Sequence, residues 1–444
     1  MLTAEDNQLL TETGPDAPMG RLFRRFWTPA LLSGELPGPD CTPVRLQVLG
    51  EDYLAFRDTQ GRVGVVEPHC PHRGADLFFG RNEQEGIRCV YHGWKFDVHG
   101  RCVDMPTLEP GTQRDRICEK TRLNALPVRE AGGIVWVYMG PGEAPPLPEL
   151  EFLTVPESHR YVSKKLQECN WAQACEGGLD TAHFSFLHMS LEDDEHSTAA
   201  MGQSALVASG NPALIRWVRN DGRPRFTILE HPAGLVIGGA RKADADDLYW
   251  RISQFLLPNH GLTPAAFAGE NYHGQTWVPI DDHSCWIYCY TWNPERPLTD
   301  AERAKFRGGH AVHAETDANH VPLRNRSNLY LLDRQEQKQR SFTGVRGVSE
   351  QDACIQDSQG RIANRTREHL GPTDIGIVRF RRRILEAARD LAAGNAPPAA
   401  MQPAAYHVRS GSAIAPSSQT LEEVMVNRFG HPHGWVAHQE KETA

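Results

Sequence analysis

The most informative parts of this sequence are two short segments, Pro68-His-Cys-Pro-His-Arg-Gly74 and Arg88-Cys-Val-Tyr-His-Gly-Trp94, which contain candidate metal ligands. Glycine and proline in each segment favour a tight loop, which brings two side chains to one metal centre without strain. Thiolates favour zinc or iron–sulfur clusters, and imidazoles favour zinc or iron. The candidate ligands are Cys70, His72, Cys89 and His92.

The order of these ligands separates the possible metal centres. The pattern is Cys-x-His followed, after sixteen residues, by Cys-x-x-His. In a Rieske [2Fe-2S] centre two cysteines ligate one iron and two histidines ligate the other, so Cys70 and Cys89 are expected on the inner iron and His72 and His92 on the outer one. A Cys₂His₂ zinc site is the main alternative, but zinc fingers usually pair cysteine with cysteine and histidine with histidine. Incidental core residues are the remaining alternative.

The composition indicates a globular protein. The 444 residues are 40% hydrophobic and 23% charged, which supports an apolar core. The net charge of -9 argues against a nucleic acid partner. No run approaches the roughly 18 apolar residues that a membrane span needs, and no signal peptide is visible. We therefore expect a cytoplasmic protein with no membrane partner, whose other eight cysteines are ordinary thiols.

Turn-forming residues divide the chain into three predicted parts. Residues 1–40 form an N-terminal arm, residues 41–145 form a small β domain, and residues 146–444 form a larger domain. The second boundary rests on the Gly/Pro cluster at residues 140–148. Strands are expected at 44–49, 53–56, 63–67 and 133–138.

The larger part is predicted to mix helices and strands. A helical stretch is expected at 168–192, strands at 277–280 and 285–292, and a long helix at 375–393 between the cap Asp374 and Gly394. Residues 395–420 are rich in Ala, Pro and Ser and are expected to be a surface linker or loop. Core packing is the expected role of the alternating aromatic residues Trp286, Tyr288, Tyr290 and Trp292.

A second candidate metal site lies in the predicted helix. Asp180 and His183 share one helical face, whereas His188 would be rotated away, so both histidines reach one metal only if the helix ends or breaks nearby. Two histidines near a carboxylate are typical of non-haem Fe(II) oxygenases, where a distant Asp or Glu completes the set. Ordinary core or surface residues are the alternative, and the upstream Cys/His motif favours the metal.

The Cys/His motif at residues 70–92 and the Asp/His motif at residues 180–188, in this order and spacing, resemble the motifs of the catalytic α-subunit of Rieske non-haem iron aromatic-ring-hydroxylating oxygenases. The resemblance covers most of the chain. A finer resemblance is to the phthalate dioxygenase-like branch, which includes phenoxybenzoate and chlorobenzoate dioxygenases and is related to vanillate O-demethylases. Asn364 departs from the Asp expected in that branch. The finer resemblance rests on Asn325–Arg334, Ser341–Gly344, Gln351-Asp352, Ser358–Gly360 and Asn364–Thr366.

The resemblance implies roles that the residues alone do not fix. It implies that Asp352, rather than Asp333 or Asp357, is the carboxylate ligand of the iron. It implies that Asp180 links the cluster of a neighbouring subunit to an iron-ligand histidine; a helix-surface carboxylate is the alternative. The implied fold is α+β: a Rieske β domain inserted in a helix-grip catalytic domain, with an antiparallel sheet and a long C-terminal helix. In this implied fold the N-terminal arm, residues 1–40, packs with the catalytic domain.

The implied function is that of an oxygenase component. It would use one Rieske cluster, one mononuclear Fe(II) per subunit and O2 to cis-dihydroxylate an aromatic carboxylate, in a homotrimer or stacked hexamer. The chain lacks a Gly-x-Gly-x-x-Gly fingerprint, so a separate NAD(P)H reductase is expected. The resemblance to the phthalate dioxygenase-like branch implies that this reductase is a flavin protein with its own ferredoxin-type cluster. O-demethylation or another monooxygenation stays open, as do a non-oxygenase electron-transfer module and a zinc-stabilised scaffold. Arg241 and Arg251 are the preferred carboxylate ligands, ahead of Arg216, Arg219 and Arg225.

Overall fold

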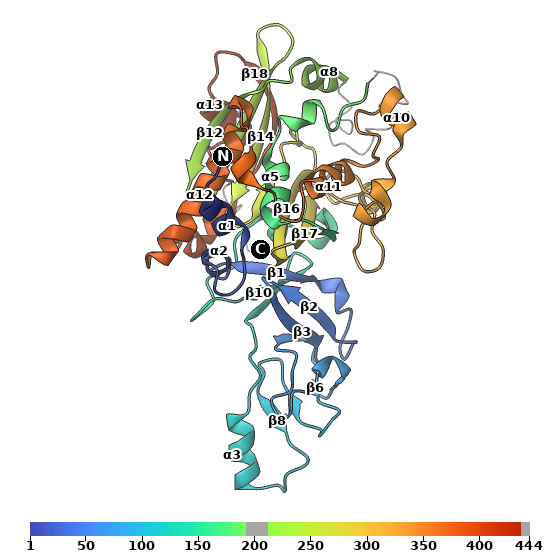
Figure 1. Ribbon diagram of the computed structural model, residues 1–444, viewed down its shortest axis with the longest axis vertical. Coiled ribbons are helices and arrows are strands. Elements are labelled where there is room, and N and C mark those ends of the chain that lie inside the picture. Colours follow the sequence, from blue (N-terminus) through green and yellow to red (C-terminus); the bar gives the residue numbers. More distant parts are fainter. Residues whose placement is uncertain (192–211, 437–444) are drawn as a thin grey trace, which may run out of the picture.

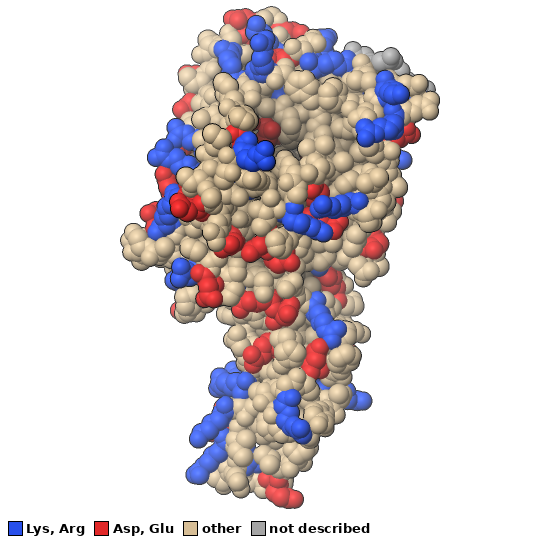
Figure 2. Space-filling model, in the orientation of Figure 1, with Lys and Arg blue, Asp and Glu red and all other residues tan. Residues whose placement is uncertain are grey.

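The computed structural model describes residues 1–191 and 212–436 (Figure 1). A broad part is built on a large sheet, and a narrow part extends from it and carries the two Cys/His loops. On the face drawn in Figure 2, acidic side chains gather around the waist between the two parts, and basic side chains lie on both. None of the described helices is both long and apolar enough to pass through a membrane.

The narrow part consists of two small antiparallel sheets with their own apolar core. The first contains β2 (Val44–Val48), β3 (Glu51–Arg57) and β4 (Val63–Val66), which confirms the three strands expected there. The second follows the order β5-β6-β7-β8, and the helix α3 lies beyond it. These further elements are β5 (Arg81–Glu83), β6 (Gly86–Arg88), β7 (Lys95–Phe96), β8 (Cys102–Asp104) and α3 (Thr112–Lys120).

A three-stranded antiparallel sheet lies where the two parts meet. Its central strand β10 (Ile134–Tyr138), expected from the sequence, pairs with β9 (Val128–Ala131) and with β1 (Trp27–Leu32) from the N-terminal segment. Two helices precede β1, α1 (Ala4–Thr11) and α2 (Pro18–Phe23), and both contact the long helix α12 (Ile375–Ala392) of the broad part. The division at residues 40 and 145 stays a prediction.

The broad part contains an eight-stranded antiparallel sheet. Its strands follow the order β11-β17-β16-β15-β14-β13-β12, and β18 pairs with β14 beside β15. The strands expected at 277–280 and 285–292 are confirmed within β16 and β17. The bounds are β11 (Arg160–Gln167), β12 (Arg225–His231), β13 (Gly234–Lys242), β14 (Asp247–Leu256), β15 (His260–Leu262), β16 (Tyr272–Asp281), β17 (Ser284–Trp292) and β18 (Gly411–Pro416).

The two faces of this sheet are covered by different helices, because successive side chains of a strand point to opposite sides. On one face Phe255 packs edge-on against Phe380 of α12, with ring centroids 4.8 Å apart. On the other face Trp250 belongs to a buried cluster with Leu421 and Met425 of α13 (Leu421–Phe429). An antiparallel sheet gripped by a long helix confirms the predicted α+β class.

Short helices complete the broad part, and one of them differs from the prediction. The helix α5 spans only Trp171–Leu179, so the helix expected over 168–192 is wrong beyond Leu179 as far as residue 191; residue 192 lies outside the described residues. The Asp180 side chain accepts a hydrogen bond from the Ala182 N–H, which turns the chain out of the helix. The others are α4 (Glu151–Thr154), α8 (Pro212–Asn220), α9 (Asp300–Arg307), α10 (Arg334–Gln339) and α11 (Val348–Ser358).

The C-terminal predictions were mixed. The long helix is α12, with Asp374 at its N-cap and Gly394 at φ +94° just after its end, as expected. The linker expected at 395–420 is wrong, since its residues 411–416 form β18 on the edge of β14. Composition misled here, because Ser412 is fully buried and donates its hydroxyl to the Pro264 carbonyl.

The aromatic residues of β17 have the core role expected of them. Tyr288, Tyr290 and Trp292 are buried, and Trp286 is partly exposed at the start of the row. They point to the face opposite α5, where Phe152 of α4 stacks on Tyr290. The other face of β17 carries Cys289 and Thr291, which are paired with Gln275 and His273 of β16.

Gly178 allows α5 to lie directly on the sheet. A Cβ atom there would stand 2.3 Å from Cζ2 of the buried Trp277 of β16. We expect Gly178→Ala to displace α5 and to lower the free energy of unfolding by roughly 1–3 kcal/mol, after the helix-propensity gain of alanine is subtracted. Thermal melting measures the effect. Gly14→Ala, which meets no atom within 4 Å, is the control; equal melting temperatures for the two variants would contradict the close packing.

Candidate metal centres and pocket

The two Cys/His loops have the same backbone design. The Cys70 N–H donates to the Ala75 carbonyl, and the Cys89 N–H donates to the Trp94 carbonyl, each over 2.8 Å. Four residues after each cysteine, Gly74 (φ +72°) and Gly93 (φ +76°) take the left-handed conformation that glycine accepts without strain. Two matching loops are therefore placed side by side, as a shared cluster requires.

Burial distinguishes the cysteines from the histidines of these loops. Cys70 and Cys89 are buried, whereas His72 and His92 are partly exposed, with ring centroids 4.4 Å apart. The Nδ1 atom of His92 is buried and has no hydrogen-bond partner among the described residues, as expected of a ligand atom. Burial, followed by the nearby Cys89, raises the pKa of the metal-free Cys70 thiol to about 11, so coordination would release its proton.

The distances between the ligand atoms of these four side chains distinguish a two-iron cluster from a single zinc ion. Among residues 1–191 and 212–436, the one set of three or more Cys, His, Asp or Glu donors with all ligand atoms within 4.8 Å is His183, His188 and Asp352. The Cys/His loops are near each other but do not converge in this way. A tetrahedral zinc ion needs such convergence, whereas a two-iron cluster does not.

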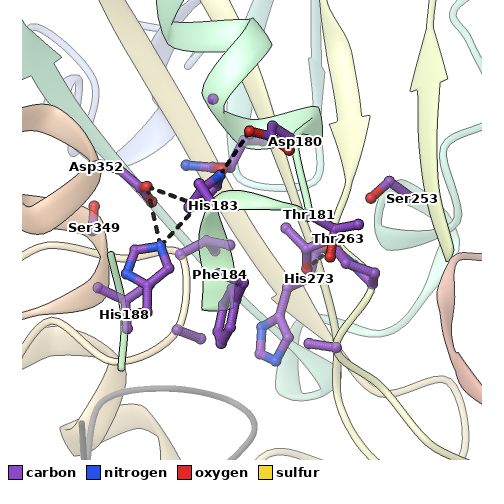
Figure 3. A pocket seen from close by; sticks show the side chains of 18 of the residues that line it. Asp180, Thr181, His183, Phe184, His188, Ser253, Thr263, His273, Ser349 and Asp352 are labelled. Carbon is purple, nitrogen blue, oxygen red and sulfur yellow. Dashed lines mark hydrogen bonds and ion pairs between the residues drawn. The ribbon is translucent and has the colours of Figure 1, made fainter. Parts of the chain in front are cut away.

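The second site joins residues from two helical regions (Figure 3). His183 and His188 follow the end of α5, and Asp352 comes from α11. The two Nε2 atoms are 3.0 Å apart, and Oδ1 of Asp352 lies 3.4 Å from Nε2 of His183 and 3.2 Å from Nε2 of His188. Ligand bonds of about 2.1 Å at right angles would put the atoms about 3 Å apart, so the set fits one six-coordinate ion.

Hydrogen bonds orient both imidazoles. His188 donates its Nδ1 proton to Oε1 of Gln351 over 2.7 Å, and the Gln351 amide is itself fixed because its Nε2 donates to the Val345 carbonyl. His183 faces Oδ2 of Asp180 through its Nδ1 at 3.5 Å. Each ring therefore turns its Nε2 atom toward the shared centre, as a metal-binding histidine does.

The electrostatics of the metal-free site also suit a cation. Burial alone lowers the pKa of His183, but the carboxylates of Asp180 and Asp352 outweigh burial and raise it to about 10. The Oδ1 atom of Asp352 is buried and accepts no hydrogen bond from the described residues. A carboxylate oxygen aimed between two imidazoles without a donor is satisfied by a metal ion.

The structure also explains why the spacing of residues in the sequence could not identify all three candidate iron ligands. His188 reaches the site because α5 ends at Leu179 and the chain turns back. Of the three aspartates considered, Asp333 caps α10, and Asp357 accepts a hydrogen bond from the Tyr330 hydroxyl. Asp352 alone of the three lies beside the histidines. No pattern in the sequence identifies Gln351 as the hydrogen-bond partner of His188.

A cavity opens beside this site and encloses about 690 Å³ of empty space, part of it open to solvent. Arg251 of β14 and Lys165 of β11 are its cationic lining residues besides the histidines. The Arg251 guanidinium lies 4.2 Å from the centre of the Phe184 ring, and its Nε donates to the Thr181 hydroxyl. Its Nη2 atom has no hydrogen-bond partner among the described residues, so it is available to a ligand.

The other arginines considered from the sequence lie elsewhere. Arg241 is fully buried and outside the cavity lining, and it donates to the carbonyls of Thr181 and Asp221. It therefore braces the loop that follows α5. Arg216 pairs with the exposed Asp244, and Arg225 is exposed at the start of β12. Sequence reasoning missed the lining residues Lys165 and His273, although polar residues alternating in β16 were a signal.

Comparison with known proteins agrees with this geometry. Residues 26–127 match the Rieske [2Fe-2S] domain family, and residues 137–431 match the LigXa C-terminal domain like family. The 3-chlorobenzoate-3,4-dioxygenase oxygenase subunit of Comamonas testosteroni is 37% identical over 97% of this chain and 99% of its own. The phthalate 4,5-dioxygenase oxygenase subunit of Pseudomonas putida is 40% identical over 89% of this chain and 88% of its own.

A solved structure shares the fold. The terminal oxygenase of carbazole 1,9a-dioxygenase from Nocardioides aromaticivorans IC177 superposes with a TM-score of 0.56 and 19% identity, over 86% of this chain and 97% of that one. The chain therefore belongs to the Rieske non-haem iron oxygenases, as a catalytic α-subunit of the phthalate dioxygenase-like branch. This membership confirms the oxygenase reading, with a Rieske cluster, a mononuclear iron, O2 and electrons from a separate component.

Proposed function

We propose that Cys70, Cys89, His72 and His92 hold the Rieske cluster and that His183, His188 and Asp352 hold the mononuclear iron. The support is the matched loops of the first set and the ligand atoms of the second set, which lie 3.0–3.4 Å apart. When bound, the cluster supplies electrons and the iron supplies the site at which O2 is activated. The protein residues orient the imidazoles and hold the substrate beside them.

Asp180 is proposed to connect the iron site to a cluster in another subunit. Within one chain the Cys/His loops lie in the narrow part, well away from α5 (Figure 1). Asp180 faces His183 at 3.5 Å and keeps its other side near the surface, with about a quarter of its side chain exposed. A head-to-tail homotrimer, alone or stacked as a hexamer, would bring a neighbour's outer histidine to this carboxylate.

Asp180→Asn tests this connection. The variant keeps the side-chain shape but loses the charge that faces His183, so both metal sites should stay loaded. Reoxidation of the reduced cluster by O2 and substrate should slow by about 10–100-fold. Stopped-flow absorbance of the cluster measures it, and Asp244→Asn, at an exposed ion pair, is the control. Reoxidation at the rate of the unchanged protein would refute the connecting role.

The proposed substrate is an aromatic carboxylate, and the reaction is cis-dihydroxylation. The observation that carries the substrate class is Arg251, a buried residue that lines the cavity beside the proposed iron site and whose guanidinium stacks on Phe184. A planar guanidinium binds a carboxylate through two parallel hydrogen bonds. The relatives named for 3-chlorobenzoate and phthalate add support.

Turnover by the Arg251 variants tests the substrate class. Loss of a charge-assisted hydrogen bond costs about 1.5–3 kcal/mol, so Arg251→Ala should lower kcat/KM for 3-chlorobenzoate or phthalate by about 10–100-fold, mostly through KM. Arg251→Lys should recover part of the loss, and the exposed Arg216→Ala is the matched control. An unchanged KM in Arg251→Ala, or equal turnover of uncharged analogues by the unchanged protein, would contradict an anionic substrate. Product analysis separates a cis-dihydrodiol from O-demethylation.

The remaining partners follow from the same proposal. Electrons are proposed to come from a separate NAD(P)H reductase that carries a flavin and a ferredoxin-type cluster. The partly exposed histidines of the Cys/His loops, together with the exposed Phe79, Val90 and Tyr91 nearby, give a docking area at the cluster end of the narrow part. The proposed location is the cytoplasm, where the substrate acid and the reductase would meet the enzyme.

A further inference from the structure

A row of hydrogen-bonded side chains runs from the cavity across the sheet. Nδ1 of His273 lies 2.7 Å from the Thr291 hydroxyl, and that hydroxyl lies 2.8 Å from Nε2 of His313. Nδ1 of His313 lies 2.7 Å from the Ser163 hydroxyl. His273 lines the cavity, and Ser163 at the other end is partly exposed, so the row joins the active-site cavity to the protein surface.

The sheet register creates this row. His273 of β16 is paired directly with Thr291 of β17. Thr291 is paired in turn with Tyr161 of β11, and Ser163 lies two residues further along β11, on the same face of the sheet. His313 comes from the segment that covers this face and lies between the two strands. Thr291 and His313 are fully buried, so bulk water has no direct access to the middle of the row.

The row is suited to move a proton because each group both donates and accepts. Burial, with His310 nearby, lowers the pKa of His273 to about 4, and burial, followed by His273 and Lys165, holds the pKa of His313 well below its usual range. Both rings are therefore neutral near neutral pH, with one N–H each. His273 lines the cavity, and its Nε2 atom has no hydrogen-bond partner among the described residues.

Only two proton arrangements satisfy all three hydrogen bonds and also use the buried Thr291 hydroxyl proton as a donor; if Thr291 accepted from both rings, that proton would have no acceptor in the row. If Thr291 donates to His313, then His273 must donate to Thr291, and His313 donates to Ser163; both rings then carry the proton on Nδ1. In the reverse arrangement Ser163 donates to His313, and both rings carry it on Nε2. Entry of one proton at Ser163 and release of one from Nε2 of His273 converts one arrangement into the other.

We propose that His273, Thr291, His313 and Ser163 form a proton relay that supplies the reaction in the cavity. Oxygenation needs protons as well as electrons: an aromatic ring, O2, two electrons and two protons give a cis-dihydrodiol, and the same inputs give a hydroxylated product and water. The electron-donor component supplies the electrons, and solvent supplies the protons at Ser163. The relay thus rests on the oxygenase activity and not on the identity of the acid substrate.

Thr291→Val tests the relay, because it keeps the shape of the side chain and removes the shared hydroxyl. The fully loaded protein is reduced and mixed with O2 and whichever aromatic acid gives the fastest single turnover, in H2O and in D2O. We expect the rate of product formation to fall on the order of 100-fold, with a larger solvent isotope effect. Thr291→Ser should restore both values. An unchanged isotope effect and rate in Thr291→Val would overturn the proposal.

The chain offers a matched control for the loss of a buried hydrogen bond. On the opposite face of β16, the Thr276 hydroxyl lies 2.7 Å from Nδ1 of the buried His260, which does not line the cavity. Thr276→Val should therefore leave the isotope effect unchanged. If Thr276→Val changed the isotope effect as Thr291→Val does, the loss of a buried hydrogen bond would by itself explain both results, and the relay would be refuted. Should Thr291→Val fail to fold, His313→Gln, which keeps hydrogen bonds but cannot pass a proton, takes its place.

The proton arrangement can also be measured without turnover. Neutron diffraction from crystals exchanged into D2O locates the deuterons on the two imidazoles. The relay requires His273 and His313 to carry them on the same ring position, both on Nδ1 or both on Nε2. Opposite positions, or a doubly protonated ring, would break the sequence of donors and acceptors and overturn the proposal. Failure of every aromatic acid to react would count against the proposed substrate class and leave this measurement unaffected.

Discussion

The site depends on the close approach that two glycines give to α5. A Cβ atom at Gly177 would stand 1.9 Å from Nε2 of Gln356 on α11, and one at Gly178 would stand 2.3 Å from Trp277 on the sheet. Each glycine costs about 1 kcal/mol of helix propensity relative to alanine. In return α5 lies in contact with both α11 and β16, so the histidines after its end meet Asp352 from α11.

The same face of the sheet provides the cavity and its chemistry. Alternate residues of β14 and β16 turn Arg251, Ser253, His273 and Gln275 toward α5, while their neighbours pack into the core on the other side. In the proposals made above, the cation at Arg251 gives the cavity a preference for anions, and the hydrogen-bonded row that begins at His273 gives it a route for protons. The proposed substrate and proton sites therefore follow from one alternation of side chains along the strands.

The sequence predicted chemistry better than it predicted boundaries. Cys70, His72, Cys89 and His92 lie within two short loops, so local spacing alone was enough to predict a metal site. Asp352 is 164 residues from His188, and only the resemblance to a family singled it out. The end of α5 at Leu179 depends on a hydrogen bond that the Asp180 side chain accepts, and the strand β18 is held by one that the Ser412 hydroxyl donates. Helix and strand propensities of single residues do not register either bond. The relay depends on strand register, which no local pattern contains.

The metal content of the purified protein tests the central assignment most directly. A Rieske cluster together with a mononuclear site predicts about three irons and two acid-labile sulfides per chain. In His183→Ala the count should fall to about two irons, with the sulfide and the visible absorption of the cluster unchanged. Two irons in the unchanged protein, or zinc without sulfide, would contradict the assignment of the two centres.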